Sequence, residues 1–188
     1  MQIQTLGFDA VQTVDLTKPF DAAQITDSAN PLFTNFGLDI PSADFADAYA
    51  IAVENVQNLA DACDGITLMP GRCSLLRSAK AIADFLEKVD RDNVSVLLAP
   101  AELIGNSSED EMFYALDGKI AGIYAADLDL MTAADAVLGD GDISWTTVLS
   151  LYHDHCEDMP IYLPDNDRFD ADRKFLEKLD EVAKRMLG

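Results

Sequence analysis

A segment with a single cation, Gly71-Arg72-Cys73-Ser74, has the composition of an anion-binding loop. It follows a short apolar run and precedes a predicted helix, whose first backbone N–H groups lack partners within the helix. A phosphate or carboxylate group would be held there by the Arg72 guanidinium, the Ser74 hydroxyl and the helix end. We therefore predict that Gly71, Arg72 and Ser74 bind a ligand. The alternative is a turn in which Ser74 caps the helix and Arg72 pairs with a neighbouring aspartate.

Two aspartates at alternate positions, Asp127 and Asp129, follow the apolar run from Ile120 to Ala126. Mg²⁺ takes oxygen ligands and is commonly held by one or two carboxylates together with a substrate phosphate. Carboxylates in such a place can also transfer protons. We predict that Asp127 and Asp129 are catalytic and that they hold Mg²⁺. The alternative is a polar strand end in a chain rich in aspartate.

Both histidines lie in one cluster, His153-Asp154-His155-Cys156. Imidazole and thiolate ligands suit zinc or copper, so an extended segment here would be a candidate metal site. Residues two apart do not share a helix face, however. We favour a solvated helix C-terminus, where the helix dipole stabilises a histidine.

The elements that must position these residues alternate along the chain from Ser42 onward. Apolar residues at steps of three and four predict an amphipathic helix with Ser42 as its N-cap. Ser108 and Glu111 fit a capping box at the start of another helix. The predicted strands are 66–69, 94–99, 120–126 and 160–163. The other predicted helices are 75–89, one from 109, 133–138, 145–152 and 170–187.

Strands separated by helices of this length imply parallel pairing with right-handed crossovers. We predict an α/β fold, a three-layer α/β/α sandwich with a mostly parallel sheet of Rossmann-like or flavodoxin-like type. GLDIPSADFADAY followed by DGITLM resembles the middle of cobalamin-binding domains, over about residues 37–140, which implies the flavodoxin-like layout. Ligands of such sheets bind outside the carboxyl ends of the strands. That edge adds Glu102 and Asp165 to the predicted ligand-binding residues.

The first 41 residues are less regular than the rest. Apolar residues within 3–8 and 11–16 predict two strands that pair with each other or join the sheet. Residues 19–41 follow as a long irregular segment, which indicates either a lid over the site or an unrecognised element. The length of 188 residues fits a single α/β domain, 1–188.

The net charge of −21 lies on a chain that is 49% hydrophobic, and 26 aspartates contribute most of it. Such a body repels phosphate backbones and anionic lipid, so we exclude direct nucleic-acid binding and membrane binding. The excess of acidic residues has three possible explanations: a solubilising surface, adaptation to a salty cytoplasm, or a surface that binds a basic protein. The oligomeric state stays open.

Neither an apolar run long enough to span a membrane nor a secretory signal is visible, and the three cysteines lack C-x-x-C spacing. These features predict a cytoplasmic protein with reduced thiols. The leading hypothesis is an enzyme that binds a small anionic or phosphorylated metabolite. The alternative is an acidic interaction protein, such as an inhibitor, immunity protein or nucleic-acid mimic, with a basic protein partner.

Overall fold

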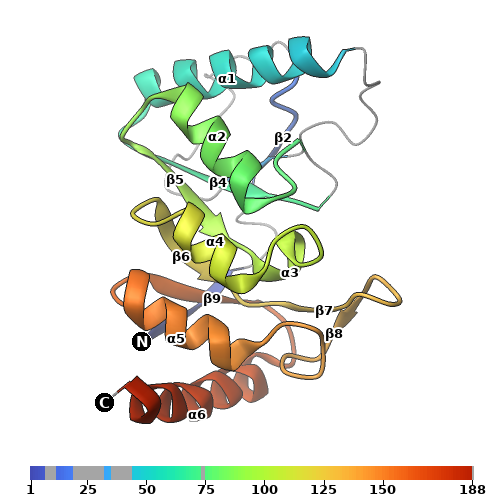
Figure 1. Ribbon diagram of the computed structural model, residues 1–188, viewed down its shortest axis with the longest axis vertical. Coiled ribbons are helices and arrows are strands. Elements are labelled where there is room, and N and C mark those ends of the chain that lie inside the picture. The colour runs from blue at the N-terminus through green and yellow to red at the C-terminus, as the bar shows by residue number, and fades with distance from the viewer. Residues whose placement is uncertain (7–11, 19–31, 35–43, 73–74, 188) are drawn as a thin grey trace.

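A computed structural model describes residues 1–6, 12–18, 32–34, 44–72 and 75–187 (Figure 1). Its main sheet has seven parallel strands in the order β1-β9-β6-β5-β4-β3-β2. The strands are β1 Gln2–Leu6, β2 Gln12–Val14, β3 Leu32–Thr34, β4 Ile66–Pro70, β5 Val94–Leu98, β6 Ile120–Tyr124 and β9 Pro160–Pro164. The four strands predicted from apolar runs correspond to β4, β5, β6 and β9.

The order of the strands is that of a (β/α) barrel. From β2 to β9 each strand of this sheet lies beside the strand of the sheet that precedes it in the chain, and β1 lies beside β9, the last strand of the sheet. In a TIM barrel the first strand likewise meets the last. A doubly wound sheet reverses its strand order at a switch point, and this sheet does not. The predicted α/β class is confirmed, but the three-layer Rossmann-like or flavodoxin-like sandwich is wrong.

The helices form one layer, as a barrel requires. They are α1 Phe45–Ala62, α2 Ala79–Val89, α3 Pro100–Leu103, α4 Glu109–Ala115, α5 Trp145–His155 and α6 Phe169–Leu187. The helix pairs α1 and α2, α2 and α4, α4 and α5, and α5 and α6 are in contact. Figure 1 shows α1, α2, α4, α5 and α6 following one another from top to bottom in chain order. In a sandwich, the helices would divide between two faces of the sheet.

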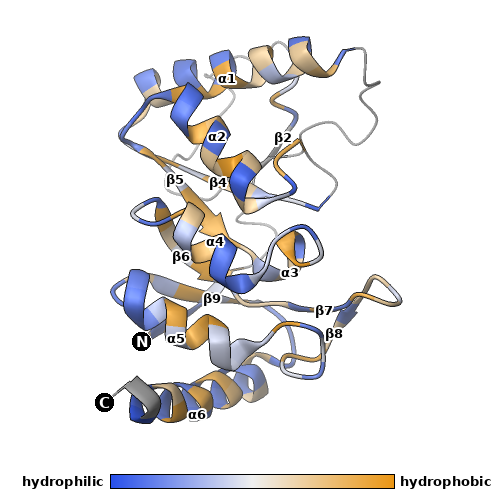
Figure 2. Ribbon diagram, in the orientation of Figure 1, coloured by the Kyte–Doolittle hydropathy of each residue, from blue (hydrophilic) through white to orange (hydrophobic). Residues whose placement is uncertain are grey.

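The two faces of the sheet bury different clusters. Strand residues such as Leu68, Val96 and Ile161 face the helices in the large core. Figure 2 shows hydrophobic and hydrophilic residues interleaved along α6, as expected for a helix with one buried face. Alternate strand residues form a smaller inner cluster of Leu6, Met69, Leu97, Ala99 and Tyr124, with Ala126 and Tyr162 beside it.

Among the predicted helix starts, those of α1 and α2 differ in the structure and that of α4 is confirmed. The N-cap of α1 is Asp44, whereas the predicted N-cap, Ser42, lies outside the described residues. Helix α2 begins at Ala79 instead of Leu75, and the Ser78 hydroxyl accepts the N–H of Ala81. The capping box of α4 is confirmed, since Ser108 and Glu111 each accept the backbone N–H of the other. The start of α2 is therefore separated in sequence from Arg72.

The helix predicted at 133–138 is wrong. Strands β7 Asp127–Asp129 and β8 Ala134–Ala136 pair as an antiparallel hairpin outside the main sheet. The alanine-rich sequence favours a helix locally. In the structure Ala133 has a φ of 55°, a turn conformation that ends any helix there. Pairing with β7 thus overrides the local preference.

The N-terminal strands lie at opposite edges of the sheet. Strand β1 pairs with β9, while β2 pairs with β3, so the two predicted strands join the sheet without pairing with each other. Strand β3 is the unrecognised element within the segment predicted as irregular. Residues 19–31 and 35–43 lie outside the described part of the chain, where the proposed lid stays a prediction. Among the described helices, none is long and apolar enough to cross a membrane.

Candidate functional site

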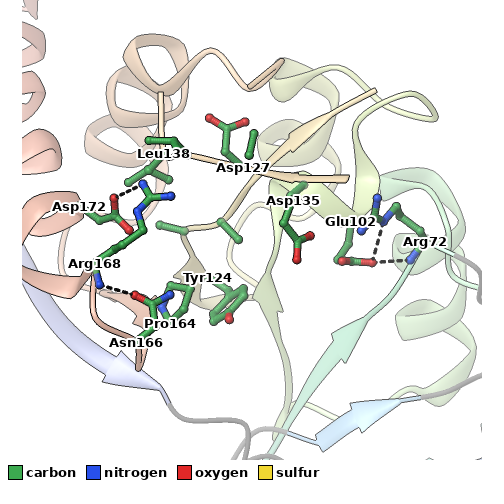
Figure 3. A pocket seen from close by; sticks show the side chains of 15 residues that line it. Arg72, Glu102, Tyr124, Asp127, Asp135, Leu138, Pro164, Asn166, Arg168 and Asp172 are labelled. Atoms are coloured by element: carbon green, nitrogen blue, oxygen red, sulfur yellow. Dashed lines mark hydrogen bonds and ion pairs between the residues drawn. The ribbon is translucent and has the colours of Figure 1, made fainter. Parts of the chain in front are cut away.

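A cavity of about 350 Å³ opens at the carboxyl ends of β4, β5, β6 and β9, with the β7–β8 hairpin as one wall (Figure 3). This is the end of a TIM barrel where active sites lie. Its volume is at the lower end of the range for small-molecule sites. The polar side chains that line it are those of Arg72, Glu102, Tyr124, Asp127, Asp135, Asn166, Arg168 and Asp172.

Arg72 and Glu102 form one side of the cavity. The Arg72 backbone N–H donates to Glu102 Oε2 at 2.8 Å, and its Nε lies 3.5 Å from the same oxygen. Both side chains are only partly exposed. The structure thus brings together two of the predicted ligand-binding residues. The third group predicted to act with Arg72, the end of α2, is already occupied, since the Ala79 N–H donates to Ser107 Oγ.

Arg168 lies on the opposite side of the cavity in Figure 3. Its Nη2 donates to Asp172 Oδ1 at 2.9 Å, and its backbone N–H donates to the Asn166 side chain at 2.9 Å. These residues follow β9, at the edge predicted from the sequence, but only Asp165 of that loop was predicted as a ligand. Asp165 itself is exposed and is not among the residues that line the cavity. Arg168 follows the same strand end in the sequence, so the place of this second cation at the edge was predictable.

Asp127 is buried, with an exposed fraction of 3%, and both of its carboxylate oxygens are engaged. Oδ1 accepts the N–H groups of Leu128 at 2.9 Å and Ile143 at 3.2 Å. Oδ2 accepts those of Gly139 at 2.8 Å and Trp145 Nε1 at 3.0 Å. In Figure 3 this carboxylate points away from Asp135, Tyr124 and Glu102. Asp127 therefore ties the base of the hairpin to the segment that leads into α5.

Asp129, the second predicted catalytic aspartate, stabilises the hairpin turn. Its Oδ1 accepts the N–H groups of Met131 at 2.8 Å and Thr132 at 3.1 Å. It is not among the residues that line the cavity. Gly71 is buried beside Arg72 and is likewise absent from that lining, and Ser74 lies outside the described residues. The roles predicted for these three residues stay predictions.

Asp135 and Tyr124 are site residues that the sequence analysis missed. Asp135, on β8, is exposed and directs its carboxylate into the cavity in Figure 3, and this carboxylate makes no hydrogen bond or ion pair with another described residue. Burial raises the pKa of Tyr124 to about 12, and the charges of Asp135 and Glu102 add to the effect. The Tyr124 phenol therefore stays protonated at neutral pH. Asp135 was missed because its segment was predicted to be a helix.

The two histidines lie at the other end of the barrel, in the last turn of α5. His153 Nε2 lies 2.6 Å from Asp180 Oδ1, and His155 Nδ1 lies 3.0 Å from Asp117 Oδ1. The predicted place at a helix C-terminus is confirmed, but the side chains of both histidines are largely buried, so the predicted solvation is wrong. These pairs join α5 to α6 and to the turn before β6.

The described residues do not assemble a metal centre. No group of three or more histidine, cysteine, aspartate or glutamate side chains among them could hold a metal ion. Mg²⁺ requires octahedral oxygen ligation. Asp127 already accepts four hydrogen bonds and Glu102 pairs with Arg72, so these carboxylates do not fit a magnesium site.

Comparison with known proteins shows the same fold. No family model matches the sequence, and no curated protein matches it. Solved structures do match: a D-tagatose 3-epimerase-like protein has 15% identity and a TM-score of 0.71 over 79% of this chain and 61% of the other. An L-ribulose 3-epimerase has 15% identity and a TM-score of 0.67 over 84% and 62%.

A third similar structure is a xylose isomerase-like TIM barrel protein from Mycobacterium smegmatis in complex with magnesium. It has 16% identity and a TM-score of 0.58 over 80% of this chain and 55% of the other. Its magnesium is compatible with the Mg²⁺ predicted from the sequence, although the carboxylates described above do not fit that ion. The likeness shows a TIM-barrel type of fold for this chain, which spans about three fifths of the first two structures.

Proposed function

We propose that this chain is an enzyme that acts on a small polyhydroxylated metabolite, bound in the cavity at the carboxyl ends of the strands. The observation that carries the proposal is the set of polar side chains that converge there from the carboxyl ends of four strands and from the β7–β8 hairpin. The similar structures are described as epimerases of sugars and as xylose isomerase-like proteins, which supports a sugar-like ligand.

The chemistry available in the cavity is acid–base chemistry. The Asp135 carboxylate accepts a hydrogen bond from a ligand hydroxyl or takes a proton from it, because described residues leave its oxygens available. The protonated Tyr124 phenol is a donor at the floor of the cavity. Arg72 and Glu102 keep the ligand-binding role predicted from the sequence. Asp127 acts here by holding the hairpin that carries Asp135.

The charge of the cavity favours a neutral ligand over the anionic or phosphorylated one predicted from the sequence. Four carboxylates line it against two guanidinium groups. Each guanidinium already pairs with a carboxylate, Arg72 with Glu102 and Arg168 with Asp172. A phosphate group would have to compete with these carboxylates, whereas hydroxyl groups donate to carboxylates and accept from guanidinium groups. A phosphorylated metabolite remains the second form of the proposal.

Calorimetric titration of the full chain tests both forms. The probes are D-fructose, D-psicose, D-tagatose and L-ribulose, with a phosphorylated ketose and inorganic phosphate as the anionic set. We expect binding of a neutral sugar that Asp135→Asn and Arg72→Ala each weaken at least tenfold, with little change in melting temperature. The matched control is Asp140→Asn, an exposed aspartate in the following turn that does not line the cavity.

Two outcomes would change the proposal. Binding of the phosphorylated ketose alone would restore the anionic ligand, with Arg72 as its anchor. Binding of no probe, or equal losses in Asp135→Asn and Asp140→Asn, would contradict the assignment of the cavity. The comparisons give no support to the alternative of an acidic protein with a basic protein partner. Cytoplasmic location, with Cys63 and Cys156 as free thiols, stays a proposal.

A further inference from the structure

The carboxylates that end β5 and β6 are already used by the protein. Glu102 and Asp127 follow these strands and reach the rim of the cavity, where a barrel would offer oxygen ligands to a cation. Each oxygen of Asp127 accepts two N–H groups, at 2.8–3.2 Å. A divalent cation at Asp127 would displace donors that fix the hairpin and the start of α5.

Glu102 has a cation beside it that belongs to the chain. The Arg72 guanidinium lies 3.5 Å from Glu102 Oε2, and the Arg72 backbone N–H approaches the same oxygen at 2.8 Å. On the opposite side, Asp172 accepts a hydrogen bond from Arg168 at 2.9 Å. Of the four carboxylates that line the cavity, only Asp135 lacks a bonded partner among the described residues.

We infer that the described carboxylates of this cavity hold no divalent cation, and that the Arg72 guanidinium supplies the positive charge beside Glu102. Among the described residues, no three histidine, cysteine, aspartate or glutamate side chains are placed to hold a metal ion, and Mg²⁺ demands a near-octahedral site. A guanidinium is always charged and donates from a fixed planar fork, so it orients ligand oxygens with no ion to load. This inference rests on the proposed function, since it assigns how the same cavity meets its ligand.

The test is a titration of the full chain with Mn²⁺ alone, followed by electron paramagnetic resonance at moderate salt to screen the acidic surface. We expect the wild-type chain to show no Mn²⁺ binding that Glu102→Gln removes. Replacing Arg72 frees Glu102 from its neighbouring positive charge. We therefore expect Arg72→Ala to gain Mn²⁺ binding at Glu102, seen as at least about a fivefold rise in the Mn²⁺ affinity of the whole chain over any that the wild type shows. The double variant Arg72→Ala with Glu102→Gln should lose that gain.

Two results would overturn the inference. One is stoichiometric Mn²⁺ binding by the wild-type chain that Glu102→Gln abolishes. The other is an Arg72→Ala chain that binds Mn²⁺ no better than the wild type. That result would show that the Arg72 guanidinium does not take the place of a metal ion beside Glu102. No sugar is present in this titration, so a result that contradicts the inference about the cation does not contradict the proposed function. Failure of the sugar titration would equally leave the metal result interpretable.

Discussion

The two ends of the barrel place carboxylates beside cationic or titratable side chains in different surroundings. At the carboxyl ends of the strands, the side chains of Arg72, Glu102 and Arg168 keep 24–37% of their surface exposed around the cavity. At the amino ends, the side chains of His153 and Asp180 are only 6% and 12% exposed. Pairing alone therefore does not identify a site. At the cavity, Arg72, Glu102 and Arg168 keep enough exposed surface to meet a ligand, whereas the buried pair of His153 and Asp180 holds α5 and α6 together.

Asp127 lies at the carboxyl ends of the strands, beside the cavity, but its hydrogen bonds show that it stabilises the fold. We expect Asp127→Ala to lower the free energy of unfolding by about 3 kcal/mol or more, because buried N–H groups lose their acceptor. Chemical denaturation measures this. Asp129→Ala is the control, since its carboxylate bonds exposed turn residues and should cost less. If Asp127→Ala were as stable as the wild type, the catalytic role predicted for Asp127 from the sequence would be favoured again.

Gly141 tests how tightly the segment wraps around Asp127. A Cβ at this position would come closer than 3.0 Å to the Asp127 carboxylate and to the backbone oxygen of Leu128. We expect Gly141→Ala to destabilise the chain by about 1–3 kcal/mol, as overpacking does. Gly65→Ala is the matched control, because the nearest atom to its Cβ would be 3.8 Å away. A Gly141→Ala chain as stable as Gly65→Ala would show that the hairpin base is loose.

Protonation of Asp180 makes the stability of the protein depend on pH in the acid range. Burial by itself would raise its pKa, but hydrogen bonds from Lys184 and His153 lower it below the ordinary value. A depressed pKa contributes stability above the unfolded pKa, near 4, and this stability is lost as the pH falls through the folded pKa. We expect Asp180→Asn to be about 1–2 kcal/mol less stable at pH 7 and to lose less stability on acidification.

Thermal unfolding from pH 7 to pH 3 measures the contribution of Asp180. The control is Asp170→Asn, an exposed aspartate in the first turn of the same helix. If Asp170→Asn changed the acid response as much as Asp180→Asn, the effect would come from net charge and not from the buried pair with His153.

Tyr124 should affect the ligand more than the fold. Because its pKa is raised to about 12, the phenol donates a hydrogen bond across the whole neutral range. We expect Tyr124→Phe to weaken sugar binding about tenfold and to lower the free energy of unfolding by about 1 kcal/mol, the contribution of one hydrogen bond. Tyr162→Phe is the control, since Tyr162 packs beside the same inner cluster without lining the cavity. Equal losses of affinity in both variants would contradict a donor role for Tyr124.

Much of the secondary structure was predictable because it depends on nearby residues. Apolar runs located β4, β5, β6 and β9, and the spacing of Ser108 and Glu111 located a capped helix. The segment from Ala134 to Ala136 was not predictable in this way, since its alanines favour a helix and only pairing with β7 makes it a strand. The class of fold was predictable, whereas the choice between sandwich and barrel was not.

The sequence by itself determined that strands alternate with helices and that polar residues follow the strand ends. That alternation is common to sandwiches and barrels, so it left the architecture open. Only the tertiary structure decided that β1 lies beside β9 and that the helices form one layer. It also separated Asp135, which faces the cavity, from Asp127, whose oxygens are engaged by the protein. Both aspartates have the same side chain, and the difference lies in donors that come from residues distant in the sequence, such as Ile143 and Trp145.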